Sequence, residues 1–244
     1  MEVRIYGNAA DIGADIADII AQQIKQKPGC VLGLATGSSP LPTYAGLIEL
    51  YKAGAVSFKD VHTFNLDEYC DLPRDDKNSY YTFMHENLFD SVDICEDNVH
   101  FLNGNAPDRE AECKHYDSSV LSSGGIDLQL LGIGNNAHIG FNEPAREFTN
   151  GSFEVKLTES TLEANKRYFP DSDMPHYALT MGVGQIIKAK SIILIATGEK
   201  KAKAVCDMIE GTVTPEVPAS VLQKHADVTV FLDKAAASLL TEVK

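Results

Sequence analysis

Two short segments of this sequence are predominantly apolar. Residues 126–131 read IDLQLL, and residues 192–196 read IILIA. A strand with one face in water alternates apolar and polar residues, so these segments predict strands that are buried on both faces. Such strands occur in parallel sheets covered by helices on each side. This feature limits the chain to an α/β architecture with a mostly parallel sheet.

Apolar segments alternate with amphipathic ones along the whole chain. The expected strands are Val3–Tyr6, Val31–Ala35, Val61–Asn65, Val99–Leu102, Ile126–Leu131, Ser191–Ala196 and Val228–Leu232. The expected helices are Ala9–Lys25, Leu41–Lys52, Ser79–Phe89, Asp108–Leu121 and Glu199–Ile209. No repeat or Pro/Gly/Ser linker interrupts this order. We predict one domain over residues 1–244, with a doubly wound, Rossmann-like sheet that has helices on both faces.

Charge and cysteine usage exclude several classes of protein. The net charge is −14, from 35 acidic and 21 basic residues, which disfavours binding to nucleic acid or to anionic membranes. No 18 apolar residues run together, and the N-terminus lacks a basic region followed by an apolar stretch. The five cysteines are scattered without a C-x-x-C pair, as expected for reduced thiols. These observations predict a cytoplasmic protein.

The loops that follow the strands are where chemistry is expected, because ligands bind outside the carboxyl ends of parallel strands. The first such loop contains Thr36, Gly37 and Ser38, followed by Pro40 at the start of a helix. Hydroxyl groups and free backbone N–H groups at a helix N-terminus attract anions, so the loop is a candidate phosphate site. The alternative is an ordinary capped helix start.

The second loop brings two adjacent carboxylates, Asp67 and Glu68, to the end of an expected strand. A carboxylate that is held in an apolar environment can act as a general base near neutral pH. The alternative is that Asp67 caps the following turn and that Glu68 faces solvent.

The third loop follows the most apolar strand and is rich in glycine and asparagine. Within residues 132–144 it also contains His138 and Glu143. A carboxylate this near in sequence can orient or charge an imidazole, which is a recognised arrangement for a general base. The alternative is a histidine with a satisfied hydrogen bond and no catalytic role.

The fourth loop places Lys200, Lys201 and Lys203 after Gly198, at the start of a helix. The helix dipole disfavours positive charge there, so such lysines suggest a bound anion. For Lys200 and Lys203 we prefer a solvated basic face. The histidines and cysteines lack zinc-binding spacing such as H-E-x-x-H, so no metal is expected.

Five longer motifs make the sequence resemble the glucosamine-6-phosphate deaminase family. They are TFNLDEY at 63–69, NSYYTFM at 78–84, LNGNAPD at 102–108, HIGFNEP at 138–144 and YALTMGVG at 177–184. The resemblance covers almost the whole chain. The wider superfamily includes 6-phosphogluconolactonase, but the FNEP and FNLDEY segments favour the deaminase branch.

The resemblance implies a deaminating isomerisation of glucosamine 6-phosphate to fructose 6-phosphate and ammonia, in amino sugar catabolism. Asp67 would move a proton from C2 to C1, and His138, assisted by Glu143, would open the sugar ring. No cofactor is implied, because the amino and carbonyl groups of the substrate supply the electron sink. The segment 152–182 would form a lid. The implied phosphate ligands are Thr36, Gly37, Ser38, Arg167 and Lys201.

Two departures from the family pattern bear on catalysis and regulation. Asn136 stands where many members carry an aspartate that adds to the acidic surroundings of the histidine. Phe153 and Val155 stand where long, hexameric members use basic residues to bind an activating sugar phosphate. We therefore expect an enzyme without that activation. The choice between monomer and homo-oligomer is left open, with a monomer favoured.

Two other functions compete with the deaminase. A lactonase or an aldose–ketose isomerase would act on a sugar phosphate that lacks an amino group. A sugar-phosphate sensor of a transcription regulator would need a basic helix-turn-helix segment, and no segment of this acidic chain supplies one. The small-molecule partner expected in either enzymatic case is a sugar phosphate.

Overall fold

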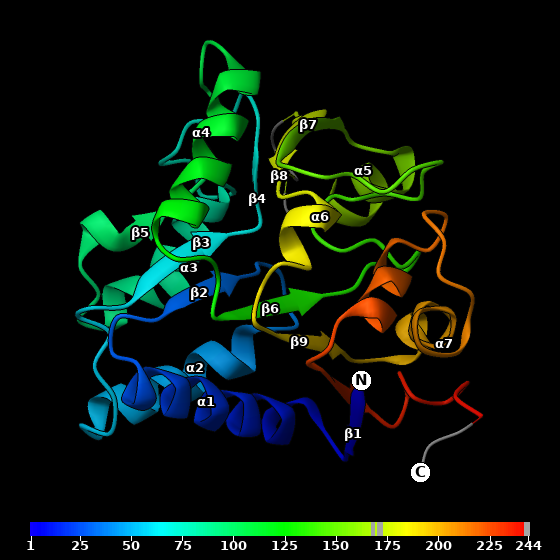
Figure 1. Ribbon diagram of the computed structural model, residues 1–244, viewed down its shortest axis with the longest axis horizontal. Coiled ribbons are helices and arrows are strands. Elements are labelled where there is room, and N and C mark those ends of the chain that lie inside the picture. Colours follow the sequence, from blue (N-terminus) through cyan, green and yellow to red (C-terminus); the bar gives the residue numbers. More distant parts are fainter. Residues whose placement is uncertain (167–168, 170–172, 242–244) are drawn as a thin grey trace.

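The seven expected strands form one parallel sheet (Figure 1). The computed structural model describes residues 1–166, 169 and 173–241. The strand order is β1-β10-β9-β6-β2-β3-β5, and every neighbouring pair is parallel. The strands are β1 (Glu2–Tyr6), β2 (Val31–Leu34), β3 (His62–Asn65), β5 (Val99–His100), β6 (Leu128–Gly132), β9 (Ser191–Ala196) and β10 (Val228–Asp233).

The order of the strands reverses at β2. From β2 the chain adds β3 and β5 on one side, and it then returns to place β6, β9 and β10 on the other side. In a doubly wound sheet the loops at such a reversal separate, and they leave a crevice at the carboxyl ends of the strands. A ligand is therefore expected between the loops that follow β2 and β6.

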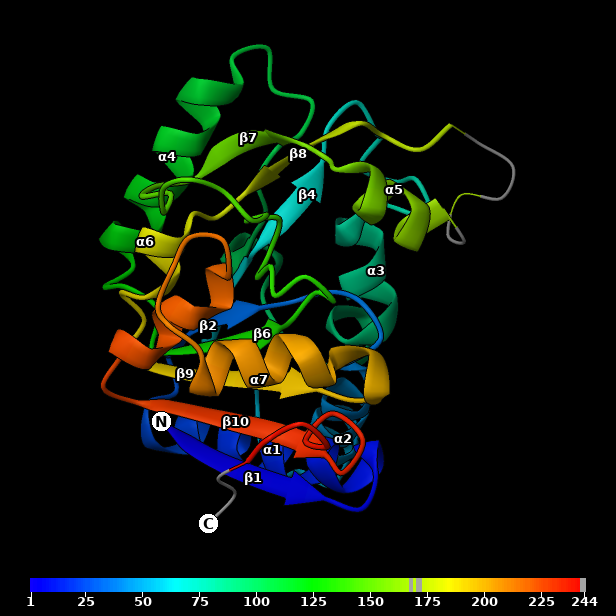
Figure 2. The ribbon, with the colours of Figure 1, turned by 90° about the vertical axis from the view of Figure 1, so that its right-hand side faces the viewer.

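Helices cover both faces of the sheet, as the apolar strands predicted (Figure 2). One core contains α1 (Ala9–Gln26), α2 (Leu41–Lys52) and α3 (Tyr80–Asn87), packed against side chains such as Leu32 of β2 and Ile193 of β9. The other core contains α4 (Arg109–Ser122) and α7 (Ala202–Glu210). These helices pack against Val31 and Leu194, which lie next to Leu32 and Ile193 along the same strands. Successive strand residues point to opposite faces, so each apolar strand contributes to both cores.

The sequence of α1 explains why this helix forms and which face it buries. Four of its five isoleucines recur every fourth residue, so they share one face, and all four of these are buried: Ile12, Ile16, Ile20 and Ile24. The side chain of Asn8 accepts a hydrogen bond from the N–H of Asp11 and caps the helix.

Within the described residues no helix is both long and apolar enough to cross a membrane.

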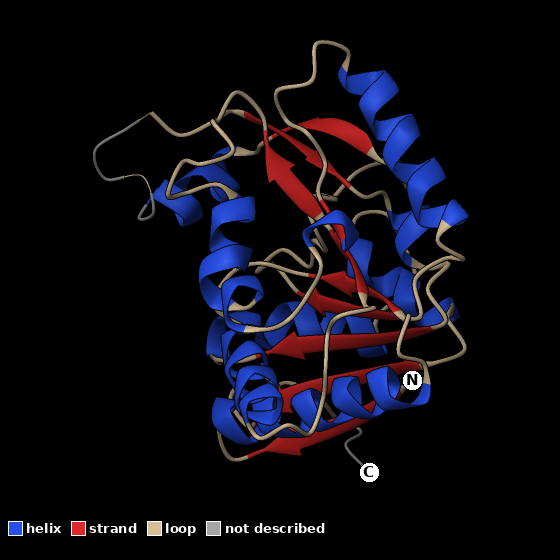
Figure 3. Ribbon diagram, turned by 90° about the vertical axis from the view of Figure 1, so that its left-hand side faces the viewer, coloured by secondary structure: helices blue, strands red, loops and turns tan. Residues whose placement is uncertain are grey.

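A second, three-stranded antiparallel sheet lies above the large one in the view of Figure 3. Its order is β4 (Asp67–Tyr69), β8 (Tyr177–Thr180) and β7 (Phe153–Lys156). The chain reaches β4 directly from β3, with only Leu66 between them. We did not predict these three strands. Two of them, β7 and β8, belong to the segment 152–182 that the family resemblance implied as a lid.

The remaining elements are short. They are α5 (Glu159–Asn165), α6 (Val183–Ile186), and the 3-10 helices η1 (Phe89–Ser91), η2 (Glu96–Asn98), η4 (Glu199–Lys201) and η5 (Pro218–Lys224). None of these short elements was predicted as a separate unit. The expected helix Glu199–Ile209 starts with η4 and continues as α7, and Gly198, with φ 88°, is the residue directly before η4.

Several predicted boundaries were wrong by one or two residues, although the fold class is confirmed. The strand expected to reach Leu102 ends at His100, and the helix expected to reach Phe89 ends at Asn87. At the end of α3 the backbone of Leu88 leaves the helical region, with φ −148°, and η1 follows. Element ends depend on such local changes of backbone direction, which a hydrophobic pattern does not encode.

A buried carboxylate joins elements at the opposite, amino end of the sheet. Asp127 directly precedes β6, and it accepts hydrogen bonds from Lys27 and Lys190, each at 2.6 Å, and from the N–H of Val31 at 2.8 Å. The carboxylate is 5% exposed, so its charge is compensated by these three donors. The interaction ties β2 and the turn before β9 to β6, far along the strands from the crevice.

Gly104 packs directly on the backbone of β4. A Cβ at this position would lie 2.0 Å from the carbonyl oxygen of Tyr69. Gly104→Ala should therefore lower the free energy of unfolding by about 1–3 kcal/mol, as measured by urea denaturation, because backbone must move to accept the methyl group. Gly7→Ala is the control, since a Cβ at Gly7 has nothing within 4 Å. A Gly104→Ala protein as stable as the control would contradict this contact.

Candidate active site

The four chemistry-bearing loops all lie at the carboxyl edge of the parallel sheet. Thr36 follows β2, Asp67 follows β3, His138 follows β6 and Lys201 follows β9. All four strands are parallel to one another within the sheet, so their carboxyl ends meet at one edge. The loops after β2 and β6 also flank the reversal of strand order. The predicted functional loops therefore share one side of the molecule.

Asp67 is a buried carboxylate at the start of β4. It pairs with Thr180 of β8 and is 7% exposed. Burial raises the pKa of Asp67 to about 8, and the negative charge of Glu68 adds to the rise. A carboxylate with this pKa can both accept and release a proton near neutral pH.

The backbone of the third loop passes close to Asp67. Gly140 has φ 57°, and a Cβ there would lie 2.9 Å from Oγ1 of Thr180 and 3.4 Å from Oδ2 of Asp67. The N–H of the next residue, Phe141, donates to Oγ1 of Thr180 at 3.0 Å. A glycine is needed at position 140, because both the backbone angle and the narrow space exclude a side chain. The loop of His138 thus contacts the strand that begins at Asp67.

Glu143 is the carboxylate partner of His138. Its Oε1 lies 3.5 Å from Nδ1 of His138, which is within ion-pair range but long for a hydrogen bond. Oε2 accepts a hydrogen bond from Nδ2 of Asn136 at 2.7 Å, and the hydroxyl of Thr161 donates to Oε1. The predicted association of His138, Glu143 and Asn136 is thus present as a contact cluster.

The environment of Glu143 keeps this carboxylate ionised. Burial alone would raise the pKa of Glu143, but His138, Thr161 and Asn136 together lower it to about 2. The side chain of Glu143 is 9% exposed, against 23% for His138. The cluster therefore combines a permanently charged carboxylate with a partly exposed imidazole, which is the arrangement of a base and its orienting group.

Local backbone geometry brings the imidazole into this position. Ala137 has φ 66°, an unusual left-handed conformation for a residue with a side chain. The N–H of Gly134 donates to the carbonyl oxygen of His138 at 2.8 Å, and the ring lies where a Cβ on Gly134 would be, 2.4–2.5 Å from the ring atoms. Any side chain at position 134 would displace the imidazole.

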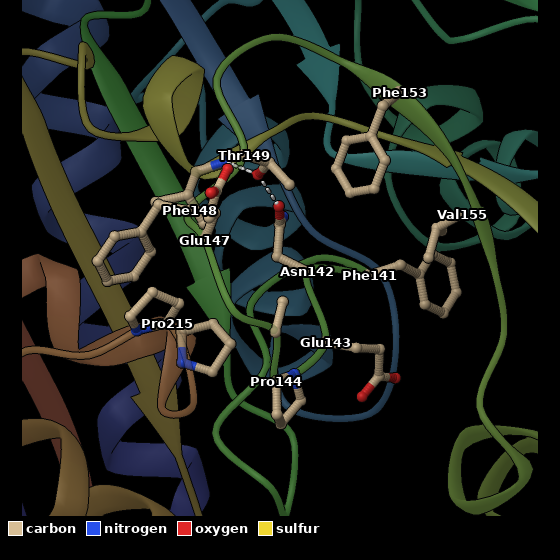
Figure 4. A pocket seen from close by; sticks show the side chains of 13 residues that line it. Phe141, Asn142, Glu143, Pro144, Glu147, Phe148, Thr149, Phe153, Val155 and Pro215 are labelled. Carbon is tan, nitrogen blue, oxygen red and sulfur yellow. Dashed lines mark hydrogen bonds between the residues drawn. The ribbon is translucent and has the colours of Figure 1, made fainter.

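Asn142 anchors the turn that carries Glu143. This side chain is 3% exposed, and its Nδ2 donates to the carbonyl oxygens of Ile139 at 2.9 Å and Met181 at 2.8 Å. Its Oδ1 accepts a hydrogen bond from Oγ1 of Thr149, and Figure 4 shows the two side chains pointing toward one another. Since Met181 follows β8, Asn142 fixes the Glu143 turn to the small sheet.

A cavity of about 150 Å³ lies behind this turn (Figure 4). Its walls include Phe141, Glu143 and Phe148, together with Phe153 and Val155 of β7. Most of the lining side chains are apolar. Phe153 and Val155, which stand where some relatives were expected to carry cations, are therefore packing residues of this cavity.

The loop after β2 has the backbone freedom expected of an anion site. Gly37 has φ 90°, Ser38 is exposed, and Thr36 is half-buried. Pro40 is the residue directly before α2, and among the described residues no side-chain hydrogen bond caps the start of this helix. Ordinary helix capping therefore does not account for the hydroxyl groups of Thr36 and Ser38, and the hydroxyl of Thr36 interacts with Tyr80 of α3.

The loop after β9 distinguishes among its lysines. Lys203 forms an ion pair with Asp207 one turn along α7, and Lys200 is exposed, in agreement with a solvated basic face for both. Lys201 ends η4 and directly precedes α7. The N–H of Gly198 donates to the carboxylate of Asp233, which fixes the start of this loop. The last candidate phosphate ligand, Arg167, lies outside the described residues.

Sequence reasoning missed Glu68, Thr161 and Asn142. Glu68 was expected to face solvent if it was not catalytic, but it is 7% exposed and accepts three backbone hydrogen bonds. Its position between two buried strand residues, Asp67 and Tyr69, was a usable signal for burial. Among the described residues no group of three or more His, Cys, Asp or Glu side chains is placed to hold a metal ion.

Comparison with known proteins identifies the family. The family of glucosamine-6-phosphate isomerases/6-phosphogluconolactonase matches residues 7–231. The chain belongs to this family. It is 51% identical to the glucosamine-6-phosphate deaminase of Clostridium botulinum (strain Alaska E43 / Type E3), over 98% of this chain and 97% of the relative. It is 52% identical to the deaminase of Clostridioides difficile (strain 630), with the same coverage.

Solved structures of the family agree with this assignment. A structure described as a monomeric glucosamine-6-phosphate deaminase superposes with a TM-score of 0.95, at 46% identity, over 98% of this chain and 100% of the other. A 6-phosphogluconolactonase from Thermotoga maritima superposes with a TM-score of 0.76 at 19% identity, over 95% of this chain and 98% of that one. The second similarity shows the shared fold alone. The resemblance seen in the sequence motifs is confirmed.

The low pKa of Glu143 predicts how stability depends on pH. The pKa of Glu143 is about 2 in the folded protein, and its ordinary value is 4.5. The ionised carboxylate therefore stabilises the fold fully above pH 4.5, and this stabilisation is lost as the pH falls toward 2. Glu143→Gln should therefore be less stable than the unmodified protein at pH 7, and the difference should shrink below pH 4.5. Urea denaturation at a series of pH values measures it.

The control for this experiment is Glu163→Gln, at an exposed position of α5. We expect its stability to follow that of the unmodified protein at every pH. A stability difference for Glu143→Gln that stays constant from pH 7 to pH 3 would mean that the loss comes from packing, and not from the ionised carboxylate.

Proposed function

We propose that the chain converts glucosamine 6-phosphate into fructose 6-phosphate and ammonia, as an enzyme of amino sugar catabolism. The observation that carries the proposal is a buried Asp67 with a pKa of about 8, on the same sheet edge as the His138–Glu143 cluster. The sequence comparison also supports the proposal, because the chain has about 50% sequence identity to several glucosamine-6-phosphate deaminases over nearly its full length.

The phosphate group of the substrate would be held by the loops after β2 and β9. Thr36 and Ser38 would donate hydroxyl hydrogen bonds, and Gly37 would let the backbone approach the phosphate oxygens. Lys201 would add a point charge and Arg167 a bidentate fork. Local cations are needed here, because the net charge of −14 repels an anionic substrate at long range.

His138 would open the sugar ring by moving a proton between the anomeric hydroxyl and the ring oxygen. The ionised Glu143, 3.5 Å from Nδ1, would orient the imidazole and stabilise its protonated form. Asn136 cannot add a negative charge, but its amide donates to Glu143 at 2.7 Å and so fixes the direction of the carboxylate. This contact supports an active site in which Asn136 positions Glu143.

Asp67 would then transfer the proton that defines the reaction. Its carboxylate takes the proton from C2 of the open-chain amino sugar, which gives an enolamine. It then returns the proton to C1, which gives a ketose imine. Water adds to the imine carbon, and ammonia leaves. One carboxylate can serve both carbons because they are adjacent. A pKa near working pH suits a group that must accept and then release the same proton.

The segment 152–182 would act as a lid over this site. It supplies β8, which pairs with β4, and β7, which pairs with β8, and it also supplies Thr161, which donates to Glu143. A closed lid would exclude water from Asp67 and strengthen the electrostatic interactions in the site. Residues 1–244 would then form one domain that contains both the catalytic base, Asp67, and the lid over it.

One assay separates the proposed reaction from the alternatives. Purified protein is incubated with glucosamine 6-phosphate in the presence of a chelator, and ammonia and fructose 6-phosphate are both measured. Equal amounts of the two products support the deaminase and exclude an essential metal. Turnover of 6-phosphogluconolactone in place of this substrate would support the lactonase, and conversion of a sugar phosphate without an amino group would support an isomerase.

We also propose that the enzyme is a monomer in the cytoplasm and lacks activation by an acetylated amino sugar phosphate. The support is the similarity to a protein described as a monomeric deaminase, together with the apolar Phe153 and Val155 in the cavity wall. Apolar side chains at these positions offer no positive charge to a phosphate group.

Asp67→Asn should bind substrate nearly normally and lose most of its turnover. The amide keeps the shape of the carboxylate but cannot take a proton from C2, so kcat should fall by at least about 10²-fold. Steady-state kinetics of ammonia release measure kcat and KM separately. A large rise in KM with little change in kcat would contradict the role of Asp67 as the base.

Lys201→Ala provides the contrasting variant. Loss of a charged hydrogen bond to phosphate costs about 1.5–3 kcal/mol, which corresponds to a rise in KM of about 10- to 150-fold. The pair of variants thus separates proton transfer from phosphate binding. An unchanged KM would assign Lys201 to the solvated face of the helix.

The rate should depend hyperbolically on the concentration of glucosamine 6-phosphate, with and without N-acetylglucosamine 6-phosphate. The reason is that a monomer has one site and that Phe153 and Val155 give the activator no cationic ligands. Initial-rate measurements test the kinetics, and light scattering at assay concentration tests the mass. Sigmoidal kinetics that become hyperbolic when the acetylated sugar is added would overturn this expectation.

A further inference from the structure

Glu68 is a buried carboxylate with a role outside the reaction steps assigned above. Its Oε1 accepts hydrogen bonds from the N–H groups of Tyr69 at 2.8 Å and Tyr80 at 3.0 Å. Its Oε2 accepts from the N–H of Tyr81 at 2.9 Å. Three backbone donors on one carboxylate form a rigid attachment, because backbone groups cannot change rotamer.

Two of these donors belong to the N-terminus of α3. Tyr80 and Tyr81 are the first residues of the helix, where N–H groups have no partner within the helix. Ser79 caps the next N–H, that of Thr82, at 3.0 Å. Glu68 therefore completes the cap from a different element, and its negative charge matches the positive end of the helix dipole.

The attachment joins the two elements that surround Asp67. Successive residues of a strand point to opposite faces, so Glu68 and Asp67 project from opposite faces of β4, with Glu68 directed at the N-terminus of α3. The ring of Tyr80 on α3 stacks on Phe141, with 6.1 Å between centroids, and its hydroxyl lies 3.2 Å from that of Tyr69. Loosening Glu68 would therefore free both the strand of Asp67 and the aromatic wall beside it.

We propose that Glu68 is the positioning residue of Asp67: it locks β4 to the N-terminus of α3 and holds a negative charge beside the reacting carboxylate. The positioning role rests on the proposed function of Asp67. The electrostatic effect on Asp67 does not, because it depends only on the two neighbouring carboxylates.

The groups around Asp67 point to Glu68 as the source of the electrostatic effect. Thr180 of β8 and Gly140 of the third loop are uncharged, and His138 of that loop is paired with Glu143. The phenols that interact with the charge of Asp67 have pKa values raised by burial, so they stay neutral at pH 8; they are Tyr69, Tyr80 and Tyr116. Arg74 acts on Glu68, where it opposes the rise in pKa that burial causes.

The test is Glu68→Gln, which keeps the size of the side chain and removes its charge. The carboxyl ¹³C signal of Asp67, assigned by its loss in Asp67→Asn, is titrated in the unmodified protein and in Glu68→Gln. We expect the midpoint to move to lower pH in the variant, because a neutral neighbour makes ionisation easier. The acid limb of kcat/KM should move in the same direction, and kcat should fall by about 10- to 100-fold.

Two further variants separate position from charge and from stability. Glu68→Asp keeps the charge but shortens the reach to α3, so kcat should fall while the acid limb stays near its original pH. Asp127→Asn removes a second buried carboxylate with three donors, at the far end of the sheet. It should lower Tm and leave both the Asp67 midpoint and the pH profile unchanged.

The possible results test the positioning role of Glu68, its electrostatic effect on Asp67 and the proposed function separately. An unchanged Asp67 midpoint and pH profile in Glu68→Gln, with only a lower Tm, would overturn the inference and make Glu68 a structural residue. If Glu68→Gln does not fold, a Glu68→Asp enzyme with unchanged kcat overturns the positioning role. If the unmodified protein releases no ammonia, the proposed function fails, while the ¹³C titration still decides whether Glu68 acts on Asp67.

Discussion

Burial of the parallel sheet on both faces is the constraint on which the rest of this structure depends. Strands such as β6 and β9 contribute side chains to both cores, so helices must cover each face and no sheet surface remains for a ligand. Only the loops at the strand ends stay open to solvent. Because the strands are parallel, the loops after β2, β3, β6 and β9 meet at one edge, and the reversal of strand order between β2 and β6 is the position at which sheets of this kind bind ligands.

The fold then gives two carboxylates at this edge opposite properties. Asp67 is 7% exposed and lies next to Glu68, so its pKa rises to about 8. Glu143 is less deeply buried, an imidazole, a hydroxyl and an amide contact its carboxylate, and its pKa falls to about 2. Environments that separate the pKa values of two acids divide the work between them. One carboxylate is suited to proton transfer, and the other to holding a charged or oriented His138.

The sequence predicted the large sheet well and the small sheet not at all. The seven strands of the large sheet are apolar segments between helical ones, and that pattern follows from burial alone. The strands β4, β7 and β8 have only three or four residues each, too few for alternation to be recognised. The pairing of β4 with β8 joins residues about 110 positions apart, such as Asp67 and Thr180, and no local pattern encodes such a register. Glu68 was misjudged for the same reason, since its helix partners lie 12 and 13 residues further along the chain.

The sequence by itself determined the parallel sheet, the four loops at its carboxyl edge and the family motifs around Asp67 and His138. These features depend on the order of apolar and polar residues along the chain, which can be read without coordinates. Only the tertiary structure decided that Asn136 and Thr161 hold Glu143, that Glu68 caps α3, and that the pKa values of Asp67 and Glu143 move in opposite directions. Hydrogen bonding and desolvation depend on distances between segments that are remote in sequence, and those distances are set when the helices and both sheets pack together.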